Sequence, residues 1–445
     1  MEGYIKRVLE AAARNGIEPA EVYMAGRDSF RAMCQKGVIS NYSVSATHGL
    51  CLRGVYQGRM GYASTEAFDE ESIPWLVERV MESARLNEDT EQAEIYPGDG
   101  EYPAMDNYAP ELDRVSAADR LALIREAEQA LLKKDPRIAA AGRNMISVTS
   151  METRIENSCG LKLSHRDNAA VAFLSALAKE GDRAATGYGL LVSRDFKDLK
   201  ADELADRAAE RALFMLGAQP VKSGTYRCIF LNEAMADMLG VFSAVFSAEN
   251  AQKNLSLLTG REGEKIASDA VTLMDDPLLK GGFASRPFDD EGVRCGTRKV
   301  IDHGVLTTLL HNLSSARKAG CVSTGNGLKA SYSAPVRVAP TNFFFAPGES
   351  TLEELMRDMG DGIVVTEVSG LHAGANAVSG DFSLIAEGYT VVDGKKGKPV
   401  EQVTVAGNFY TLLRNIRAVG CDLLFPGGGI GSPSVDIGSI AFAGK

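Results

Sequence analysis

Apolar residues recur every three or four positions in several long segments of the chain, a spacing that places them on one face of a helix. We therefore predict helices over residues 1–15, 72–85, 116–133, 201–217 and 407–418, and a further helix that starts at Asn232. Shorter runs rich in β-branched and aromatic residues lie between them and predict strands. In the first half these runs include AEVYMAG, SFRAMCQ, VISNYSVSA and GLCLRGVY.

The first half repeats one pattern of elements. Helix, several strands and helix follow one another over about residues 1–86 and again over about 116–219. Each copy ends in a Gly-Tyr strand and an acidic turn into the closing helix. We predict an α+β fold with a duplicated helix–β-meander–helix domain over residues 1–220, whose antiparallel sheets are covered by helices on one face. The acidic, proline-containing segment between the copies predicts a solvated connector, with a lid over a cleft as the alternative.

The second half is richer in glycine, since 29 of the 45 glycines follow residue 220. Glycine permits turns and close backbone approach. Strand-like runs are short and numerous here, and Asp302-His303-Gly304 between two apolar pairs predicts a hairpin turn. We expect a sheet-rich, Gly-rich domain over residues 221–445, with the domain boundary near residue 220.

Charge and composition exclude several classes of function. The 445 residues carry 59 acidic and 48 basic side chains, for a net charge of −11. Nucleic-acid and anionic membrane surfaces attract clustered cations, so we expect neither as a partner. The N-terminus has no signal-peptide pattern, and the seven scattered cysteines have no zinc-binding spacing. These features predict a cytoplasmic protein.

Five strings in the second half, taken together, resemble one protein family. They are PFDDEG at 287–292, SSARKAGCVSTGNG at 314–327, GLHAGANAVSGDFS at 370–383, VAGNFYTLLRNIRAVG at 405–420 and GSPSVDIGSIAFAG at 431–444. In order and spacing they resemble the TldD/PmbA family, whose older label is modulator of DNA gyrase. The resemblance implies a link to peptide cleavage, through leader-peptide removal and degradation of small unfolded proteins.

One branch of that family, the TldD type, carries H-E-x-x-x-H on a helix after a buried strand. Its two histidines and a C-terminal cysteine bind zinc. The matching positions here hold Asn232, Glu233 and Asp237, and Cys421 lies where the cysteine is expected. The sequence therefore resembles the PmbA branch, also called TldE, which lacks the zinc histidines. We expect no metal and no cofactor in this chain, with zinc in a TldD-type partner.

Physical chemistry agrees with a lost zinc site. Zinc takes about three or four nitrogen, sulfur or carboxylate ligands, and an asparagine amide is a poor one. Asn232 and Asp237 are five residues apart, which is roughly 140° around a helix, so their side chains diverge. Glu233 is the one candidate catalytic residue. A glutamate in the first turn is also favoured by the helix dipole, and Asn232 is a good N-cap residue.

Other polar side chains are candidates for lining a substrate cleft. They are His311, Ser323, Thr324, Asn326, His372, Asn376 and Asp381. His311 could equally be a hydrogen-bonded core histidine. Cys421, His372 and Asp381 also have the residue types of a nucleophile, base and orienting acid, although their spacing does not demand that arrangement.

The family resemblance implies a PmbA/TldE-like subunit of a metalloprotease system that processes or degrades small unfolded peptides. The chain would complete a cleft for an extended peptide, with either a TldD-type zinc subunit or a second copy of itself as its partner. One alternative is a metallopeptidase homodimer that needs no other subunit. Another is a non-catalytic binding modulator of a toxin or a topoisomerase.

Overall fold

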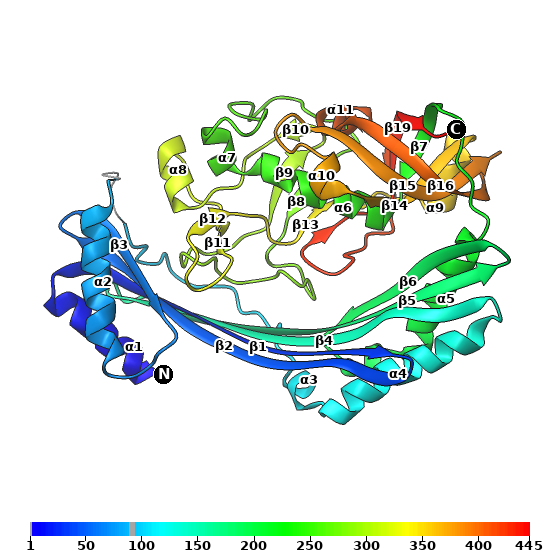
Figure 1. The fold of residues 1–445 in the computed structure, drawn as a ribbon. Coiled ribbons are helices and arrows are strands. Elements are labelled where there is room, and N and C mark those ends of the chain that lie inside the picture. The colour runs from blue at the N-terminus through cyan, green and yellow to red at the C-terminus, as the bar shows by residue number, and fades with distance from the viewer. Residues whose placement is uncertain (1, 89–93) are drawn as a thin grey trace.

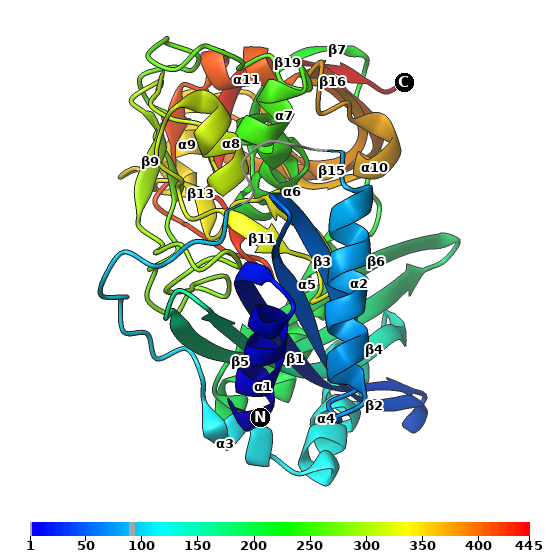
Figure 2. The ribbon, with the colours of Figure 1, turned by 90° about the vertical axis from the view of Figure 1, so that its left-hand side faces the viewer.

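A computed structural model describes residues 2–88 and 94–445 of the chain. The first helix–strand unit begins the N-terminal half. Its elements are α1 (Glu2–Arg14), β1 (Ile17–Gln35), β2 (Val38–Tyr56), β3 (Arg59–Thr65) and α2 (Ser72–Leu86). Figure 2 shows α1 and α2 side by side at one end of the molecule.

The second unit repeats this order. After the short α3 (Pro110–Arg114) come α4 (Ala117–Lys134), β4 (Ile138–Asn157), β5 (Lys162–Glu180), β6 (Arg183–Ser193), η1 (Phe196–Asp198) and α5 (Ala201–Met215). Both units share one six-stranded sheet in the order β3-β2-β1-β4-β5-β6, in which β1 pairs antiparallel with β4. The duplicated α+β arrangement predicted from the sequence is thus confirmed. Figure 1 shows the sheet curving beneath the C-terminal half of the chain.

The Gly-Tyr positions explain how each closing helix meets the sheet. A Cβ atom on Gly61 would lie 2.0 Å from the carbonyl oxygen of Val80 in α2. One on Gly187 would lie 2.2 Å from the backbone nitrogen of Ala212 in α5. Only a residue without a side chain allows so close a helix–strand approach, so both units depend on glycine at the same place.

The strands of the first unit are longer than the sequence predicts. AEVYMAG and SFRAMCQ are parts of the single strand β1, and VISNYSVSA and GLCLRGVY are parts of β2. Arg27 and Asp28 interrupt the apolar runs, but both are exposed on the sheet and remain paired in the ladder. The turn between β1 and β2 falls at Lys36 and Gly37, both with positive φ.

The C-terminal half contains two larger sheets. The first has the order β16-β15-β14-β7-β19-β17 and the second β10-β9-β8-β13-β18. The strands of the first are β7 (Gly224–Phe230), β14 (Gly362–Ser369), β15 (Asp381–Val392), β16 (Lys395–Asn408), β17 (Ala418–Val419) and β19 (Val435–Ala443). Those of the second are β8 (Leu273–Asp275), β9 (Arg298–Asp302), β10 (Val305–Leu306), β13 (Phe343–Phe345) and β18 (Ile430–Gly431). A separate pair is formed by β11 (Gly327–Lys329) and β12 (Val336–Val338).

Short helices cover these sheets and complete the core. They are α6 (Asn232–Phe242), η2 (Ser243–Phe246), α7 (Ala248–Gln252), α8 (Leu313–Ala319), α9 (Leu352–Met359), α10 (Leu371–Gly374) and α11 (Phe409–Asn415). Phe242 of α6 and Phe409 of α11 are both fully buried, and their rings stack at 4.5 Å. Within the described part of the chain, no helix combines the length and apolar character that crossing a bilayer requires.

The connector between the two N-terminal units packs against the C-terminal half. Its residues 89–93 lie outside the described residues. Beyond them, the Tyr102 hydroxyl donates to the carbonyl of Gly292 at 2.7 Å, and the Asn107 amide donates to that of Ser285 at 2.8 Å. The described part of the connector is therefore fixed along the junction of the two halves and is not a freely solvated link.

Candidate functional site

The first turn of α6 faces the second N-terminal unit. Both carboxylate oxygens of Glu233 accept hydrogen bonds from the guanidinium of Arg211 in α5, at 2.9 and 2.6 Å. The hydroxyl of Tyr188 in β6 donates to the same carboxylate at 3.1 Å, and Arg211 lies over the Tyr188 ring at 4.6 Å. Glu233 is thus held by two side chains from the other half of the chain.

Asn232 is bound to the segment that contains Cys421. Its amide donates to the carbonyl of Asp422 at 3.1 Å, and its own oxygen accepts the N–H of Glu233 at 2.8 Å. The helix starts at Asn232, as predicted, but its N-cap is Leu231 and not Asn232. Leu231 donates its backbone N–H to Val365 at 2.8 Å, which keeps it extended, so the helix starts after it. Cys421 is exposed.

Asp237 lies one turn further along α6, in an acidic environment. Partial burial, with smaller effects of the carboxylates of Glu233 and Glu367, raises its pKa to about 6. Burial also raises the pKa of Glu367, where Glu233 adds to the effect and Arg211 opposes it. Arg211 therefore supplies positive charge to a surface where three carboxylates crowd together.

These residues do not make a zinc site. Nowhere in residues 2–88 and 94–445 do three His, Cys, Asp or Glu side chains gather in a way that could hold a metal ion. The Asn232 amide nitrogen is used by Asp422, and the Glu233 carboxylate is used by Arg211. Zinc needs about three or four ligand atoms at one point, and the donors offered here are too few and already engaged.

One group of predicted cleft residues is buried in the C-terminal half. His311, Thr324 and Asn326 are 5%, 6% and 0% exposed. The Thr324 hydroxyl accepts the N–H of His311 at 2.6 Å, and the Asn326 amide donates to Asp275 at 2.7 Å. Ser323, next to them, donates its hydroxyl to the carbonyl of His311 at 3.2 Å. These hydrogen bonds join the segment at His311 to the loop at 323–326. The surroundings of His311 therefore fit the interpretation as a hydrogen-bonded core histidine.

The second group lies on the surface, around α10. Its members His372, Asn376 and Asp381 are exposed. Asn376 accepts the N–H of Val378 at 2.9 Å, and Asp381 accepts from the amide of Asn408 at 2.8 Å. The segment lines an open groove formed by Ala373–Ala377 and Asp381–Ser383. No described hydrogen bond links His372 or Asp381 to Cys421, so the contacts of a catalytic triad are absent from the described residues.

The aspartates of the PFDDEG string hold the backbone of neighbouring loops in place. Asp289 is fully buried, and its carboxylate accepts the N–H groups of Glu291, Val293 and Gly327, at 2.9, 2.9 and 2.8 Å. Asp290 pairs with Arg286 at 2.7 Å. A carboxylate that accepts several backbone N–H groups fixes a loop, and here it fixes the start of β11 against the turn.

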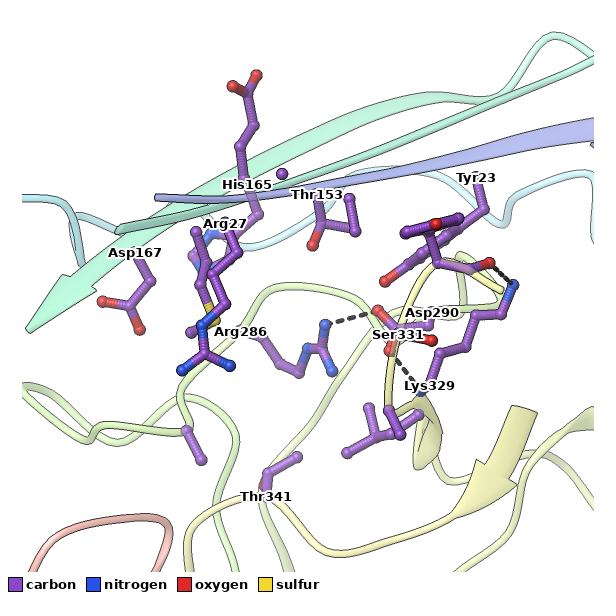
Figure 3. Close-up of a pocket in the computed structure, with 18 of the residues that line it drawn as sticks. Tyr23, Arg27, Thr153, His165, Asp167, Arg286, Asp290, Lys329, Ser331 and Thr341 are labelled. Carbon is purple, nitrogen blue, oxygen red and sulfur yellow. Dashed lines mark hydrogen bonds and ion pairs between the residues drawn. The ribbon is translucent and has the colours of Figure 1, made fainter. Parts of the chain in front are cut away.

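A cavity that the sequence did not reveal lies between the two halves. It has a volume of about 500 Å³ and opens between the N-terminal sheet and the loops around 283–290 and 328–341. Figure 3 shows Tyr23, Arg27, Thr153, His165 and Asp167 on the sheet side and Arg286, Asp290 and Lys329 across from them. The alternation of side-chain direction along β1 and β5 could have shown that these strand residues share one face of the sheet. It could not have shown which segments cover that face.

Models of known protein domains match most of the chain in three consecutive segments. Three domain models of the PmbA/TldA metallopeptidases match it: domain 1 over residues 20–84, the central domain over 110–216 and the C-terminal domain over 223–444. The metalloprotease PmbA of Escherichia coli O157:H7 is 28% identical over 94% of this chain and 92% of its own. A TldD homolog of Buchnera aphidicola (from Acyrthosiphon pisum) is 28% identical over 60% of this chain and 58% of its own.

Among solved structures, a Thermotoga maritima protein described as a candidate modulator of a DNA gyrase is similar throughout. It is 31% identical, with a TM-score of 0.92 over 99% of this chain and 100% of its own. The similarity thus extends over both halves and the junction between them.

Proposed function

The chain belongs to the PmbA/TldD family of metallopeptidases, and we propose that it acts in peptide processing as a PmbA/TldE-type subunit without zinc of its own. The observation that carries this proposal is the ion pair between Arg211 and Glu233. It engages the glutamate that, in the TldD-type pattern, lies between the zinc histidines. The proposal is also supported by the two histidine positions of that pattern, which hold Asn232 and Asp237 in this chain.

The ion pair changes what Glu233 can do. A guanidinium presents a planar pair of N–H donors that matches both oxygens of a carboxylate. Glu233 therefore faces a permanent cation of its own chain and not a water molecule to be activated. Arg211 and Tyr188 come from the N-terminal half, so the pair also fixes that half against α6. The proposed role of this region is to shape a cleft.

We place peptide contact at the groove around α10. The glycines of the segment 370–383 leave backbone accessible, and an extended peptide is recognised largely through backbone hydrogen bonds. Asn376 lines this groove and His372 is exposed on α10 beside it, so both side chains are accessible to a ligand. The proposed partner is a TldD-type subunit that carries zinc, or else a second copy of this chain. Buried Thr324 and Asn326 would support the cleft from behind without touching the peptide.

Reconstitution tests this proposal. Purified chain, a purified TldD-type homologue and their mixture are each given an unfolded peptide, and cleavage is followed by mass spectrometry. We expect the mixture to cleave faster than the homologue alone and a chelator to stop it. Glu233→Gln in this chain keeps the shape of the side chain and one acceptor oxygen, so it should not abolish cleavage. Glu203→Gln, at an exposed pair of α5, is the matched control.

Two results would favour the alternatives. Chelator-sensitive cleavage by this chain alone, abolished by Glu233→Gln, would make it a metallopeptidase that needs no other subunit. Equal rates for the homologue with and without this chain would remove the cleft-forming role and leave a separate binding function.

A further inference from the structure

The cavity between the two halves has the size of a small-ligand site. Its volume is about 500 Å³, within the roughly 300–1,000 Å³ that small-ligand pockets occupy. One wall is the face of the N-terminal sheet, and the other is made of loops from the C-terminal half (Figure 3). It is separate from the first turn of α6 and from the groove around α10, with which it shares no lining residue.

The acidic groups that line this cavity are already neutralised. Asp290 pairs with Arg286 at 2.7 Å, Asp167 with Arg194 at 3.0 Å, and Glu152 with Arg154 at 2.6 Å. A ligand cation would therefore find each carboxylate occupied by an arginine.

Two of the lining cations have no such partner. Arg27 has neither an ion pair nor a hydrogen bond with any described residue, and Figure 3 shows it extending from β1 toward the opposite loops. Lys329 lies over the ring of Tyr23 at 4.4 Å, and its Nζ donates to the carbonyl of Tyr332 at 3.4 Å. No ion pair joins it to a described carboxylate. In a chain of net charge −11, two cations without a carboxylate partner along one cavity favour an anionic ligand.

The rest of the lining suits a ligand that is apolar next to its charge. Phe283, Met151, Leu328 and Pro340 contribute apolar surface to the walls. The Nε2 atom of His165 is buried and has no hydrogen-bond partner among the described residues. Buried polar atoms are normally satisfied by protein, water or ligand, but this atom is closed off from the cavity, so a ligand would reach it only after a local movement.

The N-terminal sheet cannot bind a peptide backbone as an added strand at this cavity. The cavity wall is built from β1, β4 and β5, and each of these strands is paired on both sides within the sheet. A peptide cannot add to this sheet as a strand here, because its strands are paired on both sides at the cavity. Across from it, β11 pairs with β12 on one side, and on the other its Gly327 and Lys329 N–H groups are bonded to Asp289 and Asp290. Selection must come from the side chains that project from the sheet and from the loops opposite.

We propose that this cavity binds the carboxylate end of a short peptide, with Arg27 as the group that pairs with the carboxylate, Lys329 adding positive charge further along the cavity, and the apolar walls holding the adjacent side chain. The peptide nature of the ligand rests on the proposed function, whereas the preference for a carboxylate rests on the cavity alone. The site would hold one end of a substrate or product peptide away from the cleft around α10.

Calorimetric titration of the full chain, without any partner, tests this. Three apolar pentapeptides serve as probes: one with a free C-terminal carboxylate, the same peptide with a C-terminal amide, and the amide with one internal glutamate. We expect the free acid to bind at least about tenfold more tightly than the plain amide. Arg27→Gln should remove that difference while leaving the weak binding of the amide unchanged.

Arg31→Gln is the matched control, because it removes the same charge from the same strand outside the cavity. It should keep the full preference for the free acid. Lys329→Gln should reduce the preference too, which separates a two-cation site from a single surface arginine. Arg27 is exposed, so its variant should fold.

Equal affinity for the free acid and the plain amide, or equal loss with Arg31→Gln, would overturn the proposal. Binding of the glutamate-containing amide as tightly as the free acid would keep the carboxylate but reject the C-terminus as its source. The titration involves neither cleavage nor a TldD-type subunit, so its outcome is independent of the reconstitution test.

Discussion

Arg211 and Glu233 join the two halves of the chain by two hydrogen bonds, of 2.9 and 2.6 Å, between α5 and the first turn of α6. Glu233 occupies the position that matches the glutamate of the TldD-type H-E-x-x-x-H pattern. A cation of the chain itself thus stands beside the one residue of the motif that this sequence retains. The same contact engages both oxygens of the Glu233 carboxylate and ties the N-terminal half to α6.

Removing the arginine should destabilise the protein. Arg211→Met leaves the largely buried carboxylate of Glu233 without its counterion, so we expect the free energy of unfolding to fall by about 2 kcal/mol, less than for a fully buried pair. Urea denaturation measures this. Arg207→Met, which breaks an exposed pair on the same helix, should cost less than about 1 kcal/mol. Equal losses for both variants would show that the Arg211 pair has no special role.

The close approach of α5 to β6 predicts a strong effect at Gly187. Gly187→Ala places a methyl group 2.2 Å from the backbone of Ala212, so the helix must move. We expect a loss of about 2 kcal/mol in stability from this overpacking. Gly428→Ala adds the same group where nothing lies within 4 Å, and it should change stability by less than about 0.5 kcal/mol. A tolerated Gly187→Ala would mean that the two elements pack less tightly than described.

His165 predicts a defined dependence of stability on pH. Burial, with smaller effects of Arg286 and Arg194, lowers its pKa from 6.5 to about 4. Between these values the unfolded chain binds a proton that the folded chain does not, so stability contributed by His165 is present above about pH 6.5 and is lost as the pH falls toward 4. From about pH 7.5 to about pH 5 the loss should be about 2 kcal/mol.

The effect is measured by urea unfolding of the protein and of His165→Gln at both pH values. The variant should lose about 2 kcal/mol less than the wild type over this interval, whereas His303→Gln, at an exposed hairpin turn, should behave as the wild type. Identical pH profiles for the wild type and His165→Gln would contradict a neutral, buried His165.

Asp289 should contribute to the stability of the fold and not to peptide binding or cleavage. Asp289→Ala leaves three backbone N–H groups of the loops around 291–293 and 327 without an acceptor. We expect a loss of about 3 kcal/mol, since unsatisfied buried donors each cost about 1 kcal/mol or more. Asp302→Ala, in the exposed hairpin, is the control for loss of an aspartate. A normal unfolding midpoint with altered peptide binding would assign Asp289 to the ligand site instead.

Local patterns were enough to predict most elements of the fold. The stripe of Ile73, Leu76, Val77 and Val80 predicted the helix that the structure shows over Ser72–Leu86, and all four side chains are buried. Strand lengths were harder, because a sheet tolerates exposed polar residues such as Arg27 in mid-strand. The hairpin at Asp302-His303-Gly304 follows from its turn residues and is confirmed by the pairing of β9 with β10.

The site was only partly visible in the sequence. The motif identified Asn232, Glu233 and Asp237, but Arg211 lies on another helix 22 residues before Glu233. Their contact depends on the position of α5 relative to α6. The spacing of residues along the chain does not reveal that position. The cavity was missed for the same reason, since its two walls come from segments far apart in the sequence.

The most direct test of the account is whether zinc binds beside Glu233. Crystals of the purified chain equilibrated with excess Zn²⁺ are measured at the zinc absorption edge, and the anomalous difference map is inspected around α6. We predict that the Arg211–Glu233 ion pair remains intact with no anomalous peak next to it. A fully occupied zinc ion coordinated by Glu233, with Arg211 displaced, would contradict the central claim.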